Sequence, residues 1–440
     1  MLIAGNMIGI GIFTTTGYYA QNLSSPAGLF FIWVIGGFYA FCGALTYAEL
    51  STRFPQAGGD YLFLKNSYHP LLGFLFGWST LTVTYTGSIA AIAIGFAAYF
   101  IRILPEAWQQ WALPLPFAGV DLPLLKIIAL TITFLLTILN RAGIRKGARF
   151  QNIFTLLGIG TLLAIILLGF LSNKGNIAHF RPFFPDSLSA EEVSLLGVAL
   201  VGVMFTYSGW TVLVYIAGEI KTPRKNIPGA MAMAVGVVAL LYILINGVYL
   251  YAQPLAAMSG KVEVGYQTLT ILFAENTSLI FSLIIILMVL SSLNATILSG
   301  ARVYYAMASE GRFFKQAGQL HPQYRAPVKS LWLQFVWVAV LILAGTFNEL
   351  LTYTVFVMAL FSSLSGIALF ILRRKDGQKS ASEAVYRAWG YPLTTIIYLL
   401  ISAYLMLTTV YHRPAEALWG IFIVLTGVPV YFLWKKKNSG

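Results

Sequence analysis

The sequence predicts an all-α membrane protein that crosses the bilayer twelve times, and three observations support this prediction. Hydrophobic residues make up 58% of the 440 residues and charged residues only 10%, whereas a soluble domain carries about 25% charged residues. The hydrophobic residues fall into continuous runs of about 20 residues, the length that a transmembrane helix needs. The 24 Tyr and 10 Trp residues suit a protein with two membrane–water interfaces.

These runs define twelve spans, which we number in chain order. They cover residues 2–20, 27–50, 70–103, 122–140, 151–172, 193–218, 229–252, 277–307, 330–346, 352–372, 391–411 and 416–434. Spans 3 and 8 are long, and we expect them to tilt or to extend beyond the bilayer. A β-barrel would instead require alternating segments of about 10 residues.

The basic residues predict the orientation of the chain. Most Lys and Arg residues lie in one set of alternating loops, whereas the opposite loops hold only Lys174, Arg181, Lys261 and Arg413. Cytoplasmic loops carry the excess of Lys and Arg, so we expect both termini, including a basic tail at 435–440, in the cytoplasm. We therefore expect a multi-pass protein of a prokaryotic inner (plasma) membrane. This distribution accounts for the net charge of +13 without a nucleic-acid partner.

Two spans are interrupted. Span 1 contains GNMIGIGIF, in which glycines weaken a helix by about 1 kcal/mol each relative to alanine. In span 6 the segment TYSGW, residues 206–210, interrupts the apolar run, which resumes after it. Broken helices at corresponding positions of two halves indicate a transporter binding site. We therefore expect two inverted repeats of five spans, residues 1–172 and 193–372, and two additional helices at 391–434, all in one transport domain of residues 1–434.

A break in the middle of the membrane would expose backbone groups. The second half of the helix presents free N–H groups, which bind an anion such as a carboxylate, and the first half ends in free carbonyl groups, which suit an ammonium group. Unsatisfied backbone groups in lipid cost several kcal/mol each, so such breaks lie beside a cavity or protein. The alternative is that Gly9 and Gly11 only allow close packing of helices.

The side chains within the spans give little indication of a metal site or a cofactor. No acidic or basic residue lies deep in a span, and the four His residues lie in loops or at span ends, so we expect neither a metal site nor a cofactor. Cys42 is the only cysteine, and we expect it to be a buried apolar residue. The stripe formed by Thr82, Tyr85, Thr86 and Ser88 either lines a pathway or bonds to neighbouring helices. Glu219 with Lys221, Arg224 and Arg53 either closes a cytoplasmic gate or lies in solvent.

Several motifs together resemble the amino acid–polyamine–organocation (APC) superfamily, and within it the bacterial L-type amino acid exchangers of the serine/threonine type. The resemblance covers essentially the whole chain. Its motifs are GNMIGIGIF in span 1, FPQAGGDYLFL and GFLFGW before and in span 3, FTYSGWTVLVYIAGEIKTPRKNIPGA at span 6, SSLNATILSGARVYYAMASEGRFF with HPQYRAPVKS at span 8 and beyond, and YRAWGYP with HRPAEALWGIFIVLTGVPVYF near the C-terminus. It implies the LeuT-like five-plus-five fold with discontinuous spans 1 and 6, and transport by alternating access.

The resemblance also implies residue roles. The substrate carboxylate would meet N–H groups around Ile10 and Gly11, with Gly9 opening the turn. The amino group would meet the carbonyl groups of Met7, Phe205 and Ser208, and Phe205 would form an aromatic lid. The predicted substrate site is therefore Met7, Gly9, Ile10, Gly11, Phe205, Thr206, Tyr207, Ser208 and Gly209, with Tyr85 and Thr86 as candidates for the pocket around the substrate side chain.

One position departs from the family pattern. Many relatives carry a Lys in span 5, seven residues after the Gln of a motif that QNIFT resembles. In this chain that Gln is Gln151, and the residue seven positions later is Gly158. Three alternatives follow: exchange without a coupling cation, a sodium site that uses Thr296 or Ser299, or a water-filled gap. Gly158, Thr296 and Ser299 are therefore the candidate ion or gap site, and we favour exchange.

The sequence thus predicts a secondary transporter, not an enzyme, that exchanges neutral or small L-amino acids. A proton- or sodium-coupled symporter, a polyamine or cation uniporter, and an amino acid sensor without transport are the alternatives. A polyamine or cation uniporter would require acidic residues near the breaks in spans 1 and 6, and we expect none there. The outer loop after span 3, PEAWQQWALPLPFAGVD, has no Cys, so we expect no disulfide-linked heavy subunit, and a monomer or homodimer.

Overall fold

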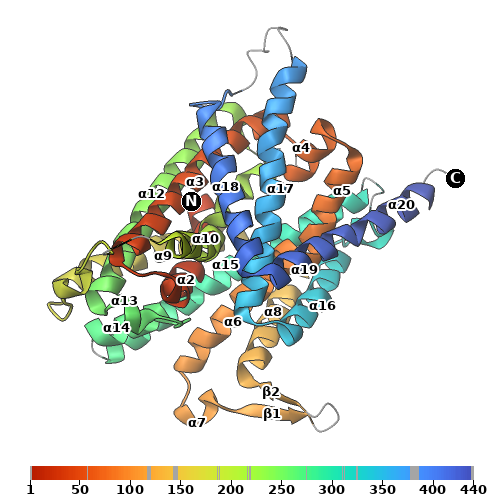
Figure 1. Ribbon diagram of the computed structural model, residues 1–440. Coiled ribbons are helices and arrows are strands. Elements are labelled where there is room, and N and C mark those ends of the chain that lie inside the picture. Colours follow the sequence, from red (N-terminus) through yellow and green to blue (C-terminus); the bar gives the residue numbers. More distant parts are fainter. Residues whose placement is uncertain are drawn as a thin grey trace.

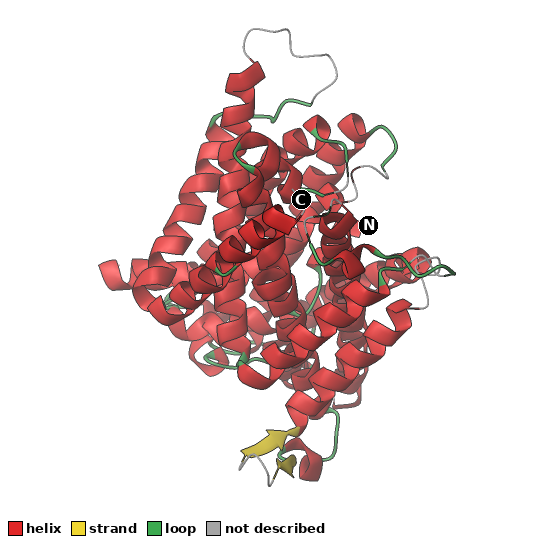
Figure 2. Cartoon of the chain, turned by 90° about the vertical axis from the view of Figure 1, so that its right-hand side faces the viewer, coloured by secondary structure: helices red, strands yellow, loops and turns green. Residues whose placement is uncertain are grey.

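The computed structural model is a bundle of apolar helices with one small hairpin (Figures 1 and 2). It describes residues 2–56, 58–115, 120–141, 147–185, 187, 189–215, 217, 220–273, 275–309, 311, 313–323, 326–376 and 386–437. Within these residues, ten helices are long and apolar enough to cross a membrane. The prediction of an all-α membrane protein is therefore confirmed.

Each predicted span coincides with a helix or with a pair of consecutive helices. In the first half these are α1 (Leu2–Met7) with α2 (Gly11–Tyr19), α3 (Pro26–Arg53), α5 (Pro70–Ser79) with α6 (Tyr85–Arg102), α8 (Leu124–Arg141) and α9 (Gly147–Leu171). In the second half they are α10 (Ala190–Tyr207) with α11 (Val212–Tyr215), α12 (Pro223–Ala252), α15 (Glu275–Ser309), α16 (Val328–Ala344), α17 (Phe347–Asp376), α18 (Leu393–His412) and α19 (Pro414–Leu425) with α20 (Gly427–Lys437).

The connections hold short elements that the hydropathy pattern does not predict. These are η1 (Ala20–Asn22), α4 (Asp60–Ser67), α7 (Glu106–Gln109), η3 (Ile177–Phe180), α13 (Leu255–Met258), α14 (Val264–Leu272) and η6 (Lys315–Gly318). Strands β1 (Ala112–Leu115) and β2 (Val120–Pro123) pair antiparallel, with Ala112 opposite Pro123. This hairpin and the C-terminal end of α17 lie at opposite ends of the molecule (Figure 1).

Large apolar side chains are exposed on the outside of the bundle. Leu139 on α8, Leu171 on α9, Met233 on α12 and Leu407 on α18 are each at least 60% exposed. Soluble proteins rarely expose contiguous apolar surface on this scale, so these faces suit lipid. Spans 3 and 6 are by contrast the most buried of the ten. The interior of the bundle is therefore built around the broken span 6 and the long span 3.

Span 3 is not a regular α-helix. Between α5 and α6 the chain forms one π-helical segment, η2 (Thr80–Thr84). Such π segments are often found at functional sites. Neighbouring spans satisfy its carbonyl groups, because Tyr304 donates to that of Thr80 at 3.1 Å and Trp337 donates to that of Thr82 at 2.8 Å. Side chains from α15 and α16 therefore stabilise this irregular turn, which aims the start of α6 into the bundle.

Candidate functional site

Span 1 is broken where the sequence places its glycines. Helix α1 ends at Met7, and α2 begins at Gly11. The amide of Ile8 still donates to the carbonyl group of Ala4 at 2.8 Å, but no side chain caps α2 at Ile10. Because the first four N–H groups of a helix have no partner within it, the start of α2 offers uncapped amide groups.

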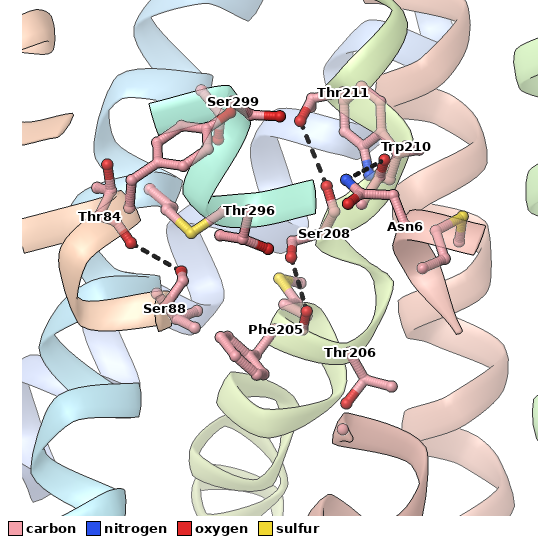
Figure 3. Close-up of a pocket in the computed structure, with 18 of the residues that line it drawn as sticks. Asn6, Thr84, Ser88, Phe205, Thr206, Ser208, Trp210, Thr211, Thr296 and Ser299 are labelled. Atoms are coloured by element: carbon pink, nitrogen blue, oxygen red, sulfur yellow. Dashed lines mark hydrogen bonds between the residues drawn. The ribbon is translucent and has the colours of Figure 1, made fainter. Parts of the chain in front are cut away.

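Span 6 is broken at the predicted position as well. Helix α10 ends at Tyr207, a 3-10 turn η4 (Ser208–Thr211) follows, and α11 resumes the span. The hydroxyl of Ser208 donates to the carbonyl group of Phe205 at 2.7 Å, and that of Thr211 donates to the carbonyl group of Ser208 at 3.3 Å (Figure 3). The Phe205 carbonyl group also accepts from the backbone N–H of Ser208, so both of its lone pairs are used, and a ligand would compete with the Ser208 hydroxyl there.

The two breaks touch. The side-chain amide of Asn6 donates to the carbonyl group of Gly209 at 3.2 Å, and a Cβ atom on Gly209 would lie 2.5 Å from the backbone carbonyl carbon of Asn6. Only glycine allows the two backbones this close. Packing is also tight at Gly11 and Gly9, where a Cβ atom would lie 2.5 Å from Oγ1 of Thr206 and 2.7 Å from Oγ of Ser292, respectively. The glycines of span 1 therefore serve both the break and close packing.

A cavity of about 150 Å³ lies at this junction (Figure 3). Spans 1, 2, 3, 6, 8, 10 and 11 and the first residue of α4 all contribute to its wall. The cavity is thus enclosed by both broken spans and by spans from both halves of the chain.

Most of the predicted site residues line this cavity. Those that do are Met7, Gly9, Ile10, Gly11, Tyr85, Phe205, Thr206, Ser208, Gly209, Thr296 and Ser299. Thr206 also bonds to Thr15 on α2, with 2.9 Å between the hydroxyl oxygens. The ring of Phe205 extends into the cavity on the side of Ser88 (Figure 3). The hydroxyls of Thr296 and Ser299 both donate to carbonyl groups of their own helix, those of Ser292 and Ala295.

Three predicted site residues lie away from the cavity wall, namely Tyr207, Thr86 and Gly158. Tyr207 is buried and donates to the carbonyl group of Trp33 at 3.1 Å. Thr86 is buried and donates to the carbonyl group of Leu81, five residues earlier, at 2.7 Å. This bond follows from the π turn, which advances the helix by an extra residue. Tyr85 and Ser88 of the polar stripe thus line the cavity, whereas Thr82 and Thr86 bond within span 3.

Gly158 lies beside the broken span 1, but apart from Thr296 and Ser299. A Cβ atom on Gly158 would lie 3.0 Å from Cε of Met288 and 3.6 Å from the side chain of Ile8. Met288 and Thr296 are eight residues apart on α15, about 12 Å along a helix. Side chains of Met288 and Ile8 therefore occupy the space next to Gly158.

Tyrosine hydroxyls hold the broken span 1 in place. Tyr242 donates to the carbonyl group of Met7 at 2.7 Å, at the end of α1. Tyr249 donates to that of Ile12 at 3.1 Å, and Tyr99 donates to that of Phe13 at 2.7 Å, both on α2. We call Tyr99, Tyr242 and Tyr249 the tyrosine clasp. They come from α6 and α12, so spans 3 and 7 support span 1 on both sides of its break.

The expectation that no acidic residue lies near the breaks is wrong. Asp60 lines the same cavity as Gly209 and is buried. It follows the loop after α3, outside every predicted span, which is why hydropathy did not reveal it. Burial raises the pKa of Asp60, and this effect outweighs the hydrogen bonds from Ser365, Tyr47 and Tyr215 that lower it. The absence of a nearby carboxylate therefore no longer argues against a cationic substrate or against proton coupling.

The other charged candidates take different places. Arg53 donates to the carboxylate of Glu49, at 2.9 Å, and Arg373 donates to the same carboxylate at 2.5 Å. Glu219 lies outside the described residues. Cys42 is buried on α3, as predicted. Among the residues that the structure describes, no group of three His, Cys, Asp or Glu residues could hold a metal ion.

Comparison with known proteins identifies related chains. The profile of the family described as amino acid permease matches residues 1–433. The human Large neutral amino acids transporter small subunit 2 is 28% identical over 99% of this chain and 79% of the relative. The mouse Asc-type amino acid transporter 1 is 28% identical over 99% of this chain and 80% of the relative. The mouse b(0,+)-type amino acid transporter 1 is 26% identical over 100% of this chain and 87% of the relative.

Proposed function

The chain belongs to the amino acid permease family and is an amino acid transporter, and on this premise we propose that it exchanges neutral or small L-amino acids by alternating access. The observation that carries the proposal is the contact between Gly209 and Asn6, which brings two broken helices together at one cavity. Broken helices at corresponding positions surround the substrate in transporters of this architecture.

The backbone at the breaks suits both ends of a zwitterion. The substrate carboxylate would accept from amide groups at Gly9, Ile10 and Gly11, where the positive end of the α2 dipole also favours an anion. The α-amino group would donate to the carbonyl groups of Met7, Phe205 and Ser208. Tyr242 already donates to the Met7 carbonyl group, which leaves a second lone pair on that oxygen for the substrate. The Phe205 carbonyl group accepts from both the backbone N–H and the hydroxyl of Ser208, so the amino group would replace the Ser208 hydroxyl there.

The rest of the cavity supports a neutral side chain. Ile92, Val355, Met358 and Phe361 form an apolar wall. Asp60, the one acidic residue among the described residues of the lining, already accepts three hydrogen bonds. We propose that Phe205 covers the bound substrate as a lid and that Tyr85 contacts its side chain. One relative that matches this chain is named a transporter of large neutral amino acids, which supports the neutral class.

The proposed architecture follows from the same family. Residues 1–172 and 193–372 would form inverted five-span repeats of the LeuT-like fold, and residues 391–434 the two additional helices. The breaks in spans 1 and 6, the first span of each repeat, support this division. The excess of Lys and Arg in one set of loops supports cytoplasmic termini in an inner membrane.

A thermal-shift screen of the twenty amino acids with the purified protein would identify substrates, because a ligand that binds only the folded state raises its stability. Counterflow in proteoliposomes then tests exchange. We expect uptake of a labelled neutral L-amino acid only when the vesicles are preloaded with an unlabelled one, and no uptake of the D-enantiomer. Failure of preloading at any ion gradient would reject exchange. Uptake driven only by a proton or sodium gradient would show a symporter, and binding without flux would show a sensor.

A further inference from the structure

Asp60 joins three separate spans at one end of the cavity. Its Oδ1 accepts from the hydroxyl of Tyr47 on α3 at 2.5 Å and from that of Ser365 on α17 at 2.6 Å. Its Oδ2 accepts from the hydroxyl of Tyr215 on α11 at 2.9 Å. We call Asp60, Tyr47, Tyr215 and Ser365 the Asp60 cluster. One carboxylate thus links spans 2 and 10 to the short second half of span 6.

The sequence before Asp60 explains its position. Gly58 and Gly59 have φ angles of 138° and 51°, which glycine adopts without strain. They turn the chain so that α4 begins at Asp60 with its side chain buried. A Cβ atom on Gly59 would lie 2.7 Å from the ring of Tyr215 and 3.3 Å from Val214. Helix α11 therefore rests directly on the Gly59–Asp60 turn.

The titratable groups around Asp60 are tyrosines. Tyr47 and Tyr215 donate to it. Tyr85 on α6 and Tyr398 on α18 lie near enough to interact electrostatically with its carboxylate. Burial, the three hydroxyls and a backbone hydrogen bond at Asp60 have the largest effects on its pKa. An ionised carboxylate accepts all three hydroxyls, whereas a protonated one carries a hydrogen on one oxygen and loses acceptor capacity. The strength of the cluster therefore depends on whether Asp60 is ionised.

We propose that Asp60 is a positioning residue of the transport cycle, which holds α11 closed over the cytoplasmic end of the cavity. The proposal rests on the proposed function and on its orientation, in which α11 is the cytoplasmic half of span 6. To release substrate into the cytoplasm, α11 has to move away from α4, α3 and α17. The bond between Tyr215 and Asp60 is the part of the cluster that this movement breaks, and protonation of Asp60 weakens it.

Thiol labelling tests the position of α11 without relying on transport. In a Cys42→Ser background, Ser362→Cys places one thiol in the cavity wall, on α17. A membrane-impermeant maleimide is added to the cytoplasmic face of inside-out vesicles.

Loss of a hydrogen bond to a charged group predicts labelling at least about tenfold faster for Asp60→Asn and for Tyr215→Phe. Lower pH reduces the thiolate that reacts with the maleimide in every protein, so the labelling rate of the reference protein should rise relative to that of Asp60→Asn at the same pH. Asp121→Asn, at an exposed site in β2, is the matched control and should label at the reference rate.

Transport provides the second readout. We expect Asp60→Asn to bind the amino acid with an affinity within about threefold of wild type in the thermal-shift assay. Its maximal exchange rate should fall at least about fivefold, because the inward-open state accumulates, and Asp60→Glu should restore part of that rate. Unchanged labelling and an unchanged pH profile in both variants would overturn the proposal, as would loss of amino acid binding in Asp60→Asn, which would make Asp60 a substrate ligand. If the wild type exchanges no amino acid but the labelling result holds, the proposed function fails and the closing role of Asp60 stands.

Discussion

Gly209 and Asn6 hold the two broken spans in contact: the Asn6 side chain donates to the Gly209 carbonyl group at 3.2 Å, and no Cβ atom fits between the two backbones. At Gly9 and Gly11 the close neighbours are side chains, which can adjust their rotamers. At the contact between Gly209 and Asn6 both partners are backbone, so a larger residue forces the helices apart. The junction is therefore the most constrained point of the candidate site.

Gly209→Ala tests that constraint. The added methyl group would lie 2.5 Å from the Asn6 carbonyl carbon and oxygen, and overpacking of this kind costs about 1–3 kcal/mol. We expect a lower melting temperature and at least about a tenfold loss of counterflow. Gly236→Ala on α12 is the matched control, because nothing lies within 4 Å of its Cβ position. It should keep its counterflow, and its melting temperature should not fall, since alanine stabilises a helix interior relative to glycine. Wild-type exchange by Gly209→Ala would show that the two breaks need not touch.

Phe205→Ala tests the proposed lid. Removing the ring deletes apolar contact with a bound substrate, and we expect KM for exchange to rise about tenfold, equivalent to about 1.4 kcal/mol of binding. Phe205→Tyr keeps the ring and should stay close to wild type. Phe422→Ala, at a site on α19 that is 57% exposed, controls for loss of a phenyl group. Equal KM values for Phe205→Ala and wild type would exclude a lid at this position.

Tyr242→Phe removes one member of the tyrosine clasp. It leaves the Met7 carbonyl group at the end of α1 without its 2.7 Å donor, and a buried acceptor left unsatisfied costs about 1–3 kcal/mol. We expect weaker substrate binding in the thermal-shift assay together with slower exchange. Tyr411→Phe, at a site 78% exposed, should change neither. Wild-type affinity in Tyr242→Phe would mean that span 1 keeps its shape without this bond.

Gly158→Lys restores the amine that many relatives carry in span 5. The new side chain begins 3.0 Å from the flexible end of Met288 and 3.6 Å from Ile8, so it can reach the break by displacing Met288. Burial lowers the pKa of a lysine, and we therefore expect exchange to acquire a pH dependence that Gly158→Met lacks. If Gly158→Lys exchanges like wild type at every pH, the glycine at this position has no part in coupling.

Burial of Asp60 predicts the pH dependence of stability. Its pKa is higher in the folded protein than in the unfolded chain, so below the unfolded value, about 3.9, the carboxyl is protonated in both states and costs nothing. As the pH rises from the unfolded value towards the folded value, the unfolded chain ionises while the folded protein keeps its proton, so the free energy of unfolding falls. We expect the melting temperature of the wild type to fall relative to that of Asp60→Asn as the pH rises above about 4. Parallel curves for the two proteins would contradict the raised pKa.

Hydropathy and glycine positions were enough to predict the spans and both breaks. Span length is set by the bilayer, and a polar or glycine-rich interruption stands out against a continuous apolar run, as GNMIGIGIF and TYSGW do. The positions of Thr86 and Tyr207 could not be predicted in this way. The π turn at Thr80–Thr84 shifts the helical phase of every residue after it, and no residue type marks such a turn in the sequence.

Asp60 was missed for a different reason. Hydropathy treats residues outside the spans as loop, and the Gly58–Gly59 turn places Asp60 in the cavity wall from such a loop. The doublet of glycines before an acidic residue was a visible signal, but its meaning depends on α11 packing on the turn, a contact between residues more than 150 positions apart in the chain. Long-range contacts of this kind have no local pattern.

The tyrosine clasp has an electrical consequence. A lysine at position 158 would hold span 1 with a full positive charge, whereas Tyr99, Tyr242 and Tyr249 hold it with neutral hydroxyls. Moving one elementary charge through a membrane potential of 100 mV changes the free energy by about 2.3 kcal/mol. The tyrosine clasp has no net charge, so its rearrangement moves no charge through the membrane potential. The proposed one-for-one exchange of zwitterions moves no net charge across the membrane either. Under that exchange, the voltage across the membrane would neither drive nor oppose the cycle, and the amino acid concentrations on the two sides alone would set the direction of net flux.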